Sequence, residues 1–409
     1  MKLKKWLAAL LSAGMLLSLA VPAFAAQEEM LIDVSDDYDW TRFANDNITL
    51  NVYNWGQYVA DGTEGSIDVI REFEKLTGIK VAYLNYDTNE SLYAKMSSGG
   101  ADFDVIVPSD YMIGKMVREG MLAKLNYDNI PNAAGVGEQY RHQSYDPNDE
   151  YTVPYTWGVV GIIYNTTMVD QEVTSWDIMW DPYYTGEVLM FNNSRDAFAI
   201  AAKKLGMSLN PQTEEEINII AEELKAQKTV VQAYVMDEIF DKMGGGEAAI
   251  APYYAGDAIT MIADNPDLAF AIPEEGTNYF VDAMCIPASS KKKEAAEMFI
   301  NFMCETEVAA ANCDFIGYST PIQAVWEQLD DEIKYSPIAY PSPEVLKNTE
   351  TFAVLDDDIN QKMDQAWSMM KSYTEGGSGW MILAFLVIAV ALNIFILWRK
   401  YHKKKRDNY

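Results

Sequence analysis

Two apolar periodicities alternate along the chain between residues 46 and 304. The segment 48–53 alternates as a strand, and the helix after it is expected to start at an N-cap at Ser66 and to end at Gly78. This alternation of strands and helices predicts an α/β fold with a mostly parallel sheet covered on both faces. The expected strands are 48–53, 79–83, 104–108, 159–164, 187–190, 279–287 and a strand with a turn at 248–256, and the expected helices are 67–77, 90–98, 195–205, 214–227 and 292–304.

The two ends of the chain carry apolar runs of a different kind. Lysines at positions 2, 4 and 5, an apolar run over 6–21 and small residues up to Ala25 predict a secretory signal peptide over 1–25. Residues 380–398 hold no charged side chain and would span about 28 Å as a helix, close to the thickness of a bilayer core. We therefore expect a single C-terminal transmembrane helix.

The residues around this span complete the expected topology. The basic tail 399–409 is expected to stay in the cytoplasm, which places the ectodomain outside the cell or in the periplasm. Residues 376–379 are typical of a flexible spacer, and 26–45 of a mobile acidic lead. A buried soluble helix at 380–398 is disfavoured because the segment is apolar on every face, and no LPxTG-like sortase motif precedes it.

The protein carries a formal net charge of −30, from 31 basic and 61 acidic residues. Such a charge repels phosphate backbones, which argues against nucleic acid as a partner and makes cations the natural ligands. The three cysteines, Cys285, Cys304 and Cys313, are an odd number, and apolar surroundings predict buried, unpaired thiols. No metal-ligand spacing is present in the sequence, so we expect no metal and no cofactor.

Enzyme chemistry has few candidate residues in this sequence. His142 is the only histidine before the expected membrane span, and the sequence holds no GxSxG, HExxH or P-loop pattern. A glycosidase that uses two carboxylates remains an alternative, because acidic and aromatic residues are plentiful. We therefore expect a binding protein rather than an enzyme.

Six loop segments, each following an apolar strand, combine aromatic residues with small or acidic ones. Ligands of α/β sheets gather at the carboxyl ends of the strands, so these loops form the candidate site. The segments are 53–58, 108–111, 193–196, 253–257, 279–282 and 317–321.

The order of these segments resembles the extracellular solute-binding proteins of polyamine ABC importers, the spermidine/putrescine-binding family, from about residue 49 to residue 373. The matching stretches are YNWGQYV, FEKLTGIKV, DVIVPSDYMIGKM, DPNDEYTVPYTWG, SWDIMW and FIGYSTP. The resemblance implies a two-lobed periplasmic-binding-protein fold, type II-like, with the ligand enclosed between the lobes. It implies one lobe from 46–158 with 282–326, and another from 159–281 with 327–375.

The resemblance also carries the family's binding residues onto this sequence. Asp282 matches the acid that meets an amino group near the middle of the site, and Asp196 the acid that faces a terminal amine. The implied polyamine-binding residues are Trp55, Tyr58, Ser109, Tyr111, Asp196, Tyr254, Asp257, Phe280, Asp282 and Tyr318, with Gln57, Asp110 and Asn193 as further candidates.

Several positions depart from the family pattern. Tyr254 and Phe280 stand where members usually have tryptophan, and Phe352 replaces a polar residue. Asn193 replaces a carboxylate that spermidine-preferring members use, and Asp257 matches putrescine-type members. Because a third ammonium group would lack a counter-charge at Asn193, we expect putrescine to bind more tightly than spermidine.

The chemistry of a polyamine fits these residues independently. A methylene chain with ammonium groups needs ring faces along its length and carboxylates at intervals. We therefore expect a monomeric ectodomain, tethered by the C-terminal helix, that delivers a polyamine to an ABC permease by cleft closure. The alternatives are a sensor that reports polyamines to a membrane partner, a carboxylate glycosidase, and a receptor for an amino acid or ferric iron.

Overall fold

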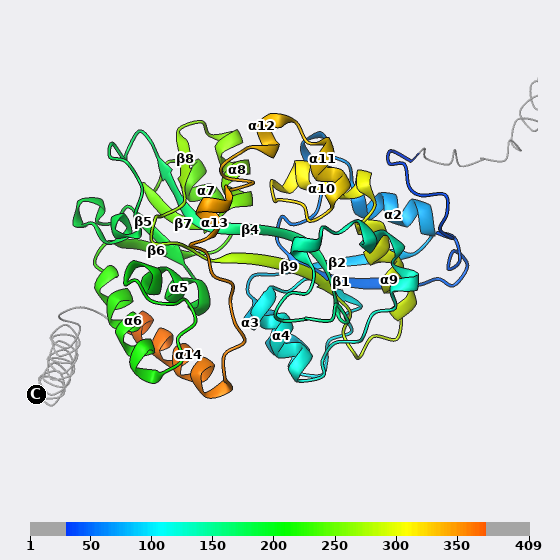
Figure 1. The fold of residues 1–409 in the computed structure, drawn as a ribbon, viewed down its shortest axis with the longest axis horizontal. Coiled ribbons are helices and arrows are strands. Elements are labelled where there is room, and N and C mark those ends of the chain that lie inside the picture. Colours follow the sequence, from blue (N-terminus) through cyan, green and yellow to red (C-terminus); the bar gives the residue numbers. More distant parts are fainter. Residues whose placement is uncertain (1–29, 374–409) are drawn as a thin grey trace, which may run out of the picture.

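Residues 30–373 are the part of the chain that the computed structural model describes, and a nine-stranded sheet runs through them (Figure 1). The strand order is β2-β1-β3-β9-β4-β7-β5-β6, and β8 pairs with β4 outside this path. The strands are β1 (Thr49–Trp55), β2 (Lys80–Tyr86), β3 (Val105–Ile106), β4 (Thr152–Asn165), β5 (Val188–Phe191), β6 (Val231–Val235), β7 (Ile250–Tyr254), β8 (Leu268–Ala271) and β9 (Tyr279–Cys285).

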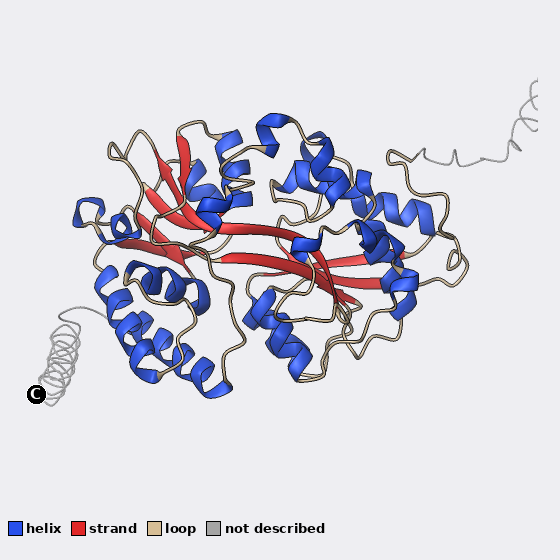
Figure 2. Ribbon diagram, in the orientation of Figure 1, coloured by secondary structure: helices blue, strands red, loops and turns tan. Residues whose placement is uncertain are grey.

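Helices pack on both faces of this sheet (Figure 2). The α-helices are α2 (Val69–Thr77), α3 (Asn89–Ser97), α4 (Asp110–Arg118), α5 (Ser194–Lys204), α6 (Glu214–Gln227), α7 (Glu238–Gly244), α8 (Ala255–Asp264), α9 (Lys293–Met303), α10 (Thr306–Ile316), α11 (Gln323–Gln328), α12 (Asp331–Lys334), α13 (Pro343–Leu346) and α14 (Asp357–Ser372). Short 3₁₀ helices are Thr63–Gly65, Tyr127–Asn129, Pro131–Gly135, Glu138–Tyr140, Trp176–Trp180 and Pro182–Tyr184.

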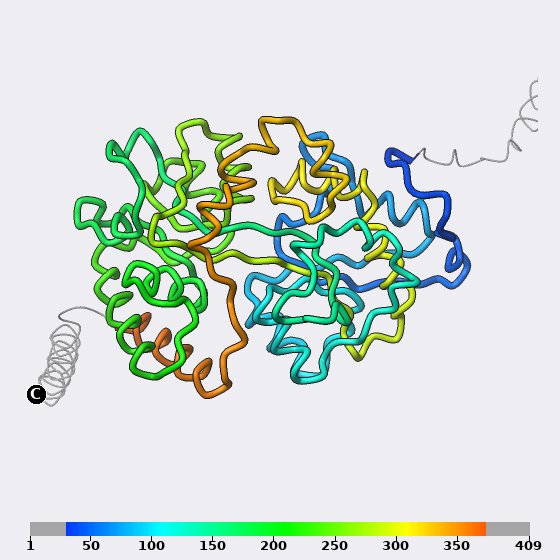
Figure 3. The backbone as a smooth tube through the Cα atoms, in the orientation of Figure 1, coloured from blue at the N-terminus to red at the C-terminus, as the bar shows by residue number. Residues whose placement is uncertain are grey.

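Two long strands connect two lobes. Residues 152–159 of β4 pair with β9, whereas residues 160–165 of the same strand pair with β7 and β8 in the other lobe. The chain leaves the first lobe along β4, returns along β9, and crosses once more in the segment before α14 (Figure 3). Residues on β9 therefore lie where the lobes meet.

Strand directions differ from the mostly parallel sheet that the sequence predicts. The pairs β1–β2, β1–β3, β5–β6 and β5–β7 are parallel, but β3–β9, β4–β7, β4–β8 and β4–β9 are antiparallel. The prediction was wrong because the alternation of elements identifies strands without fixing their directions. The two connecting strands run in opposite directions, and the parallel pairs are confined to the outer parts of the sheet.

Each lobe has its own hydrophobic core. One core includes Phe73 of α2 and residues of α9, and the other includes Phe191 of β5 and Met363 of α14. Burial of these apolar faces is the main force that holds each lobe together. The lobe boundaries expected near residues 158 and 281 fall within β4 and β9, the strands that both lobes share, and stay a prediction.

The segment expected to be a mobile lead is packed onto the first lobe over residues 30–45. Ile32 and Trp40 are buried in the core, and the Trp40 ring meets that of Phe302 edge-on, with 6.0 Å between the centroids. The backbone N–H of Leu31 donates to Glu72 Oε2 at 2.8 Å. The prediction of mobility was wrong because it weighed the acidic residues and not these apolar anchors.

Predictions about the chain ends and the cysteines have different outcomes. The signal peptide over 1–25, and the membrane span over 380–398 with its spacer and tail, lie outside the described residues. Within 30–373, no helix is long and apolar enough to cross a bilayer. All three cysteines are free, and Cys285 and Cys304 are buried, whereas Cys313 is half-buried.

Candidate functional site

Side chains from four strand ends meet between the lobes. Trp55 is the last residue of β1 and Tyr58 lies in the loop after it, β3 leads to Ser109 at the N-cap of α4, and β5 and β7 lead into α5 and α8. Asp196 and Asp257 lie in the first turns of α5 and α8. The first turn of a helix has N–H groups without intrahelical partners, and it favours negative charge. The fold thus gathers polar side chains at the carboxyl ends of the strands.

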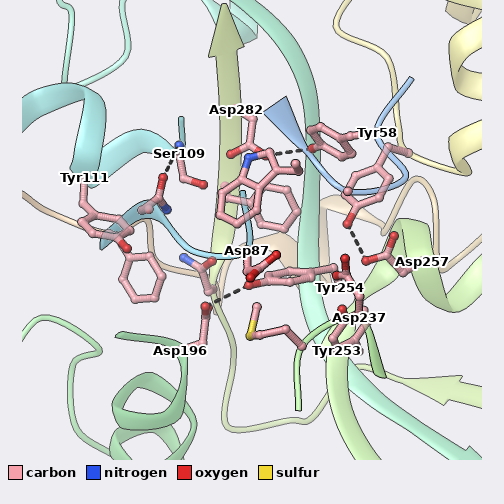
Figure 4. Close-up of a pocket in the computed structure, with 18 residues that line it drawn as sticks. Tyr58, Asp87, Ser109, Tyr111, Asp196, Asp237, Tyr253, Tyr254, Asp257 and Asp282 are labelled. Atoms are coloured by element: carbon pink, nitrogen blue, oxygen red, sulfur yellow. Dashed lines mark hydrogen bonds between the residues drawn. The ribbon is translucent and has the colours of Figure 1, made fainter. Parts of the chain in front are cut away.

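A cleft between the lobes holds about 630 Å³ of space outside protein atoms, part of it open to solvent (Figure 4). All ten residues that the resemblance implies line this cleft, and two of them project from the connecting strand β9. The ten are Trp55, Tyr58, Ser109, Tyr111, Asp196, Tyr254, Asp257, Phe280, Asp282 and Tyr318.

The three further candidates do not line the cleft. Gln57 lines a second hollow beside it. Asp110 is buried outside the cleft lining, and its carboxylate accepts hydrogen bonds from the backbone N–H groups of Tyr111 at 2.6 Å and Phe352 at 3.3 Å. Burial raises the pKa of Asp110 to about 8. Asn193 is turned toward the start of α5, where it caps the helix.

The cleft also has lining residues that the sequence analysis missed. Asp87 directly follows β2, whereas Asp237 follows β6, a strand that the sequence pattern did not predict. Neither residue lies in a loop rich in aromatic residues. Phe352, a departure from the family pattern, does line the cleft, and its ring meets that of Tyr111 at 5.6 Å. The additional lining residues are Gly56, Asp87, Asn89, Met236, Asp237, Tyr253, Asn278 and Phe352.

Asp282 projects from β9 into the cleft beside Tyr58 (Figure 4). The Tyr58 hydroxyl donates to Asp282 Oδ2 at 2.8 Å and also contacts the hydroxyl of Thr156. Asp282 Oδ1 is buried and has no hydrogen-bond partner among the described residues. Burial raises the pKa of Asp282 to about 7, and the hydroxyl groups of Tyr58 and Ser109 oppose the shift. A buried carboxylate oxygen without a partner is costly, and a cationic donor would relieve that cost.

Asp196 is held by two side chains. The Tyr254 hydroxyl donates to Asp196 Oδ2 at 2.9 Å, and Asn193 Nδ2 donates to the same oxygen at 2.6 Å. Asn193 Oδ1 accepts the backbone N–H of Asp196 at 2.8 Å. Burial raises the pKa of Asp196, and these two side-chain hydrogen bonds oppose the shift. The Asn193 amide is thus used by α5 and Asp196 and does not line the cleft, and the expected preference for putrescine over spermidine stays a prediction.

Asp257 forms a contact between the lobes. The hydroxyl of Tyr318, which follows α10 in the first lobe, donates to Asp257 Oδ2 at 2.9 Å. Burial raises the pKa of Asp257 to about 8, and this hydrogen bond opposes the shift. A Cβ atom on Gly256 would lie 2.2 Å from Tyr318 Cδ2, so the absence of a side chain at Gly256 lets the Tyr318 ring reach α8.

Aromatic rings form much of the cleft wall. The rings of Tyr58 and Tyr318 meet edge-on with 4.8 Å between centroids, and those of Tyr254 and Phe280 with 5.6 Å. The indole N–H of Trp55 donates to a backbone carbonyl at 2.9 Å, which fixes the orientation of the ring. Ring faces cover apolar chains and attract cations. The walls therefore suit a ligand that is both apolar along its length and positively charged.

The charge of the cleft has one sign. Its lining includes five aspartates and no lysine, arginine or histidine. Arg195 is buried near the cleft but outside its lining, with its guanidinium carbon 5.2 Å from the Tyr111 ring centroid and 4.6 Å from that of Phe352. An enclosed cavity of this charge would bind a cation strongly and reject an anion.

Two lobes joined by crossing strands, with a polar cleft between them, define the two-lobed periplasmic-binding-protein fold. Residues 101–349 match the model of a family described as bacterial extracellular solute-binding protein, and the chain belongs to this family. Its members bind substrates for transport and are not enzymes. The expectation that this chain is not an enzyme is thereby confirmed.

Several relatives are similar over nearly their whole length. The spermidine/putrescine-binding periplasmic protein of Escherichia coli is 34% identical over 85% of this chain and 93% of its own. The putrescine-binding periplasmic protein PotF of the same organism is 26% identical over 90% and 98%. A solved structure of the spermidine/putrescine substrate-binding protein PotD from Streptococcus pneumoniae is 33% identical, with a TM-score of 0.68 over 80% of this chain and 99% of that chain. A solved structure described as a spermidine/putrescine ABC transporter from Listeria monocytogenes is 34% identical, with a TM-score of 0.76 over 80% of this chain and 99% of that chain.

Proposed function

We propose that this protein is a receptor that captures a polyamine outside the cytoplasm and delivers it to an ABC permease. The observation that carries the proposal is the cleft: five aspartates and several aromatic rings line it, without a basic side chain. The buried, unpartnered Asp282 Oδ1 provides a position for one ammonium group. The names of the relatives support the same ligand class.

The ten residues implied by the resemblance are the proposed binding residues. Asp282, Asp196 and Asp257 would accept ammonium groups, each beside a tyrosine hydroxyl that orients the carboxylate. The rings of Trp55 and Tyr254 would cover the methylene chain. Each charge-assisted hydrogen bond in an enclosed cleft is stronger than one between neutral groups.

Delivery would depend on closure of the lobes around the ligand. Tyr318 of one lobe meets Asp257 of the other at 2.9 Å, and both line the cleft. A ligand that contacts both lobes stabilises the closed arrangement by its extra affinity for it. We assign 46–158 with 282–326 to one lobe and 159–281 with 327–375 to the other, and a permease would recognise the closed pair.

The proposed location is the cell membrane, with the ectodomain outside and the chain anchored by 380–398. The support is the uncharged span and the basic residues after it. Carbonate extraction of membranes should leave the full-length protein in the pellet, and protease added to intact cells should cut it. Release at high pH would contradict the anchor without affecting the proposed ligand.

The proposed ligand class is tested by calorimetry of the full-length protein in mild detergent. The panel is putrescine, cadaverine, spermidine, spermine, amino acids, simple sugars and ferric citrate. We expect saturable 1:1 binding of the amines alone. Binding of another class without binding of any amine would overturn the proposal, and hydrolysis of a glycoside would support the glycosidase alternative instead.

Transport and sensing are separated by an uptake measurement. Cells that lack this protein should lose uptake of radiolabelled putrescine at low external concentration, and the plasmid-borne gene should restore it. Unchanged uptake together with an altered transcriptional response to polyamines would favour the sensor.

A further inference from the structure

Asp87 and Asp237 line the cleft from opposite lobes and lie close to its mouth. Asp87 follows β2, and Asp237 comes directly before α7. Both residues are exposed, in contrast to the buried Asp282 and Asp196. In the view of Figure 4, both residues are labelled next to Tyr254.

Neither of these two carboxylates has a partner of its own. Among residues 30–373, no side-chain hydrogen bond or ion pair involves Asp87 or Asp237, and Asp237 does not cap α7 with its side chain. Desolvation by the surrounding cleft walls and the neighbouring charge of Asp87 raise the pKa of Asp237, although its side chain still reaches solvent. Asp237 in turn contributes to the raised pKa of Asp257. Three aspartates of the cleft therefore repel one another in the absence of a cation.

The loop of the first lobe comes very close to Asp237. A Cβ atom on Gly56 would lie 2.5 Å from Asp237 Oδ2, so a larger residue at position 56 would force this carboxylate to turn away. Asp237 thus lies against the Gly56 loop of the opposite lobe. The same cavity contains the buried, unpartnered Asp282 Oδ1, which points independently to a cationic ligand in it.

We infer that Asp87 and Asp237 together bind an additional ammonium group of a triamine ligand. The other two ammonium groups are accepted by the inner aspartates, Asp196, Asp257 and Asp282. The aromatic rings of the cleft and the three inner aspartates then bind the diamine part of the ligand. Asp87 and Asp237 bind the terminal ammonium of the aminopropyl group, which extends toward the mouth of the cleft. The inference rests on the proposed function and reverses the expectation that spermidine lacks an acceptor for its third charge.

An ammonium group fits this pair better than a metal ion does. Calcium takes six to eight oxygen ligands, whereas no group of three or more His, Cys, Asp and Glu side chains in residues 30–373 is arranged to hold a metal. An ammonium group needs only two or three acceptors, and two carboxylates from opposite lobes provide them. Its binding would also remove the repulsion across the mouth and favour closure.

The test compares the affinities of spermidine and putrescine for the full-length protein in detergent, measured by calorimetry with a chelator present. The variants are Asp87→Asn, Asp237→Asn and the double variant. Asp241→Asn is the matched control, since Asp241 lies on the same helix, is exposed and is outside the cleft lining. We expect the double variant to lower the ratio of spermidine to putrescine affinity by about tenfold, and Asp241→Asn to leave the ratio unchanged.

The outcomes separate this inference from the proposed function. If each single variant lowers the ratio of spermidine to putrescine affinity by less than the double variant does, with unchanged melting temperatures, the result would support one ammonium position shared by both aspartates. Equal loss of both affinities, or an unchanged ratio in the double variant, would overturn the inference and leave the polyamine receptor standing. If the parent protein binds neither amine, the proposed function fails, and the inference fails with it.

Discussion

The inner and outer carboxylates of the cleft differ in how the fold prepares them. Each inner carboxylate accepts a hydrogen bond from a tyrosine hydroxyl and is buried or half-buried, whereas the outer two are exposed and have no such partner among the described residues. The inner pairs are Asp282 with Tyr58, Asp196 with Tyr254, and Asp257 with Tyr318, and the outer residues are Asp87 and Asp237.

This difference separates affinity from selectivity. A buried carboxylate held by a tyrosine forms strong interactions with an ammonium group, because solvent screening is reduced and the geometry is fixed in advance. An exposed carboxylate is screened by water and salt and contributes less binding free energy. The inner three should therefore determine whether any polyamine binds, and the outer two should determine which one binds better.

The largest effect is expected from Asp282→Asn. Removal of one charge from a desolvated ion pair costs about 2–5 kcal/mol, so the affinity for both amines should fall by about 30-fold or more. Calorimetry measures this loss, and the ligand-free melting temperature at pH 8 should stay equal or rise, because a buried charge is removed. Unchanged binding in a normally folded variant would show that Asp282 does not meet the ligand.

A pH titration should give the next largest effect. The pKa values of Asp282 and Asp257 are raised by burial to about 7 and about 8, so protons compete with the ligand below these values. The affinity for putrescine should fall by more than about tenfold from pH 9 to pH 6. Asp282→Asn should flatten this profile, and a profile as steep as that of the parent would contradict the assignment.

The same pKa shifts predict how the ligand-free protein responds to pH. Folded-state pKa values above those of the unfolded chain mean that the folded state binds more protons between about pH 4 and pH 8, so stability falls as pH rises through that window. Thermal melting without ligand should show this contribution. The fall in stability across this pH window should be smaller in Asp257→Asn and unchanged in Asp241→Asn.

Trp55→Ala measures how much an aromatic ring contributes to polyamine affinity, for comparison with the contribution of a carboxylate. Loss of one ring face should cost about 0.5–2 kcal/mol, or about 2- to 30-fold in the affinity for both amines. Trp55→Phe should recover part of the loss, because a smaller ring still covers the methylene chain. If Trp55→Phe binds as weakly as Trp55→Ala, the indole acts through its hydrogen bond to the backbone and not through its face.

The smallest effect is expected from Asn193→Asp, which alters neither set of carboxylates directly. An aspartate at this position can still cap α5, but it would repel Asp196 and remove the amide donor. Both affinities should fall by about threefold, with an unchanged ratio of spermidine to putrescine affinity. A selective gain for spermidine would support the sequence-based argument about Asn193.

Much of the strand-to-site arrangement could be predicted from the sequence, because strand ends and helix starts have local signals. Gly78 ends α2 with φ 74°, as expected, but the N-cap is Asp68 and not Ser66: Asp68 Oδ1 accepts the backbone N–H of Arg71 at 2.9 Å. Both residue types are good caps, and only the tertiary structure decides between neighbouring ones.

Other features depend on contacts between distant segments. The stretch around Gly256 has the composition of a turn, yet it is helical, and its glycine is required by the Tyr318 ring from the other lobe. A local sequence pattern cannot predict this contact, because Gly256 and Tyr318 are far apart in the sequence. Asp87 and Asp237 were missed for a related reason, since each lies alone beside its strand and gains meaning only when the lobes bring both to one cleft.

The most direct test of the account is a crystal structure of the ectodomain, released from the full-length protein by protease, with spermidine bound. We expect the ligand in the cleft with its chain along Trp55 and Tyr254, and one nitrogen within about 3 Å of Asp282 Oδ1, the buried atom that has no hydrogen-bond partner among residues 30–373. A closed, crystallised complex in which no ligand nitrogen contacts Asp282 would contradict the central claim.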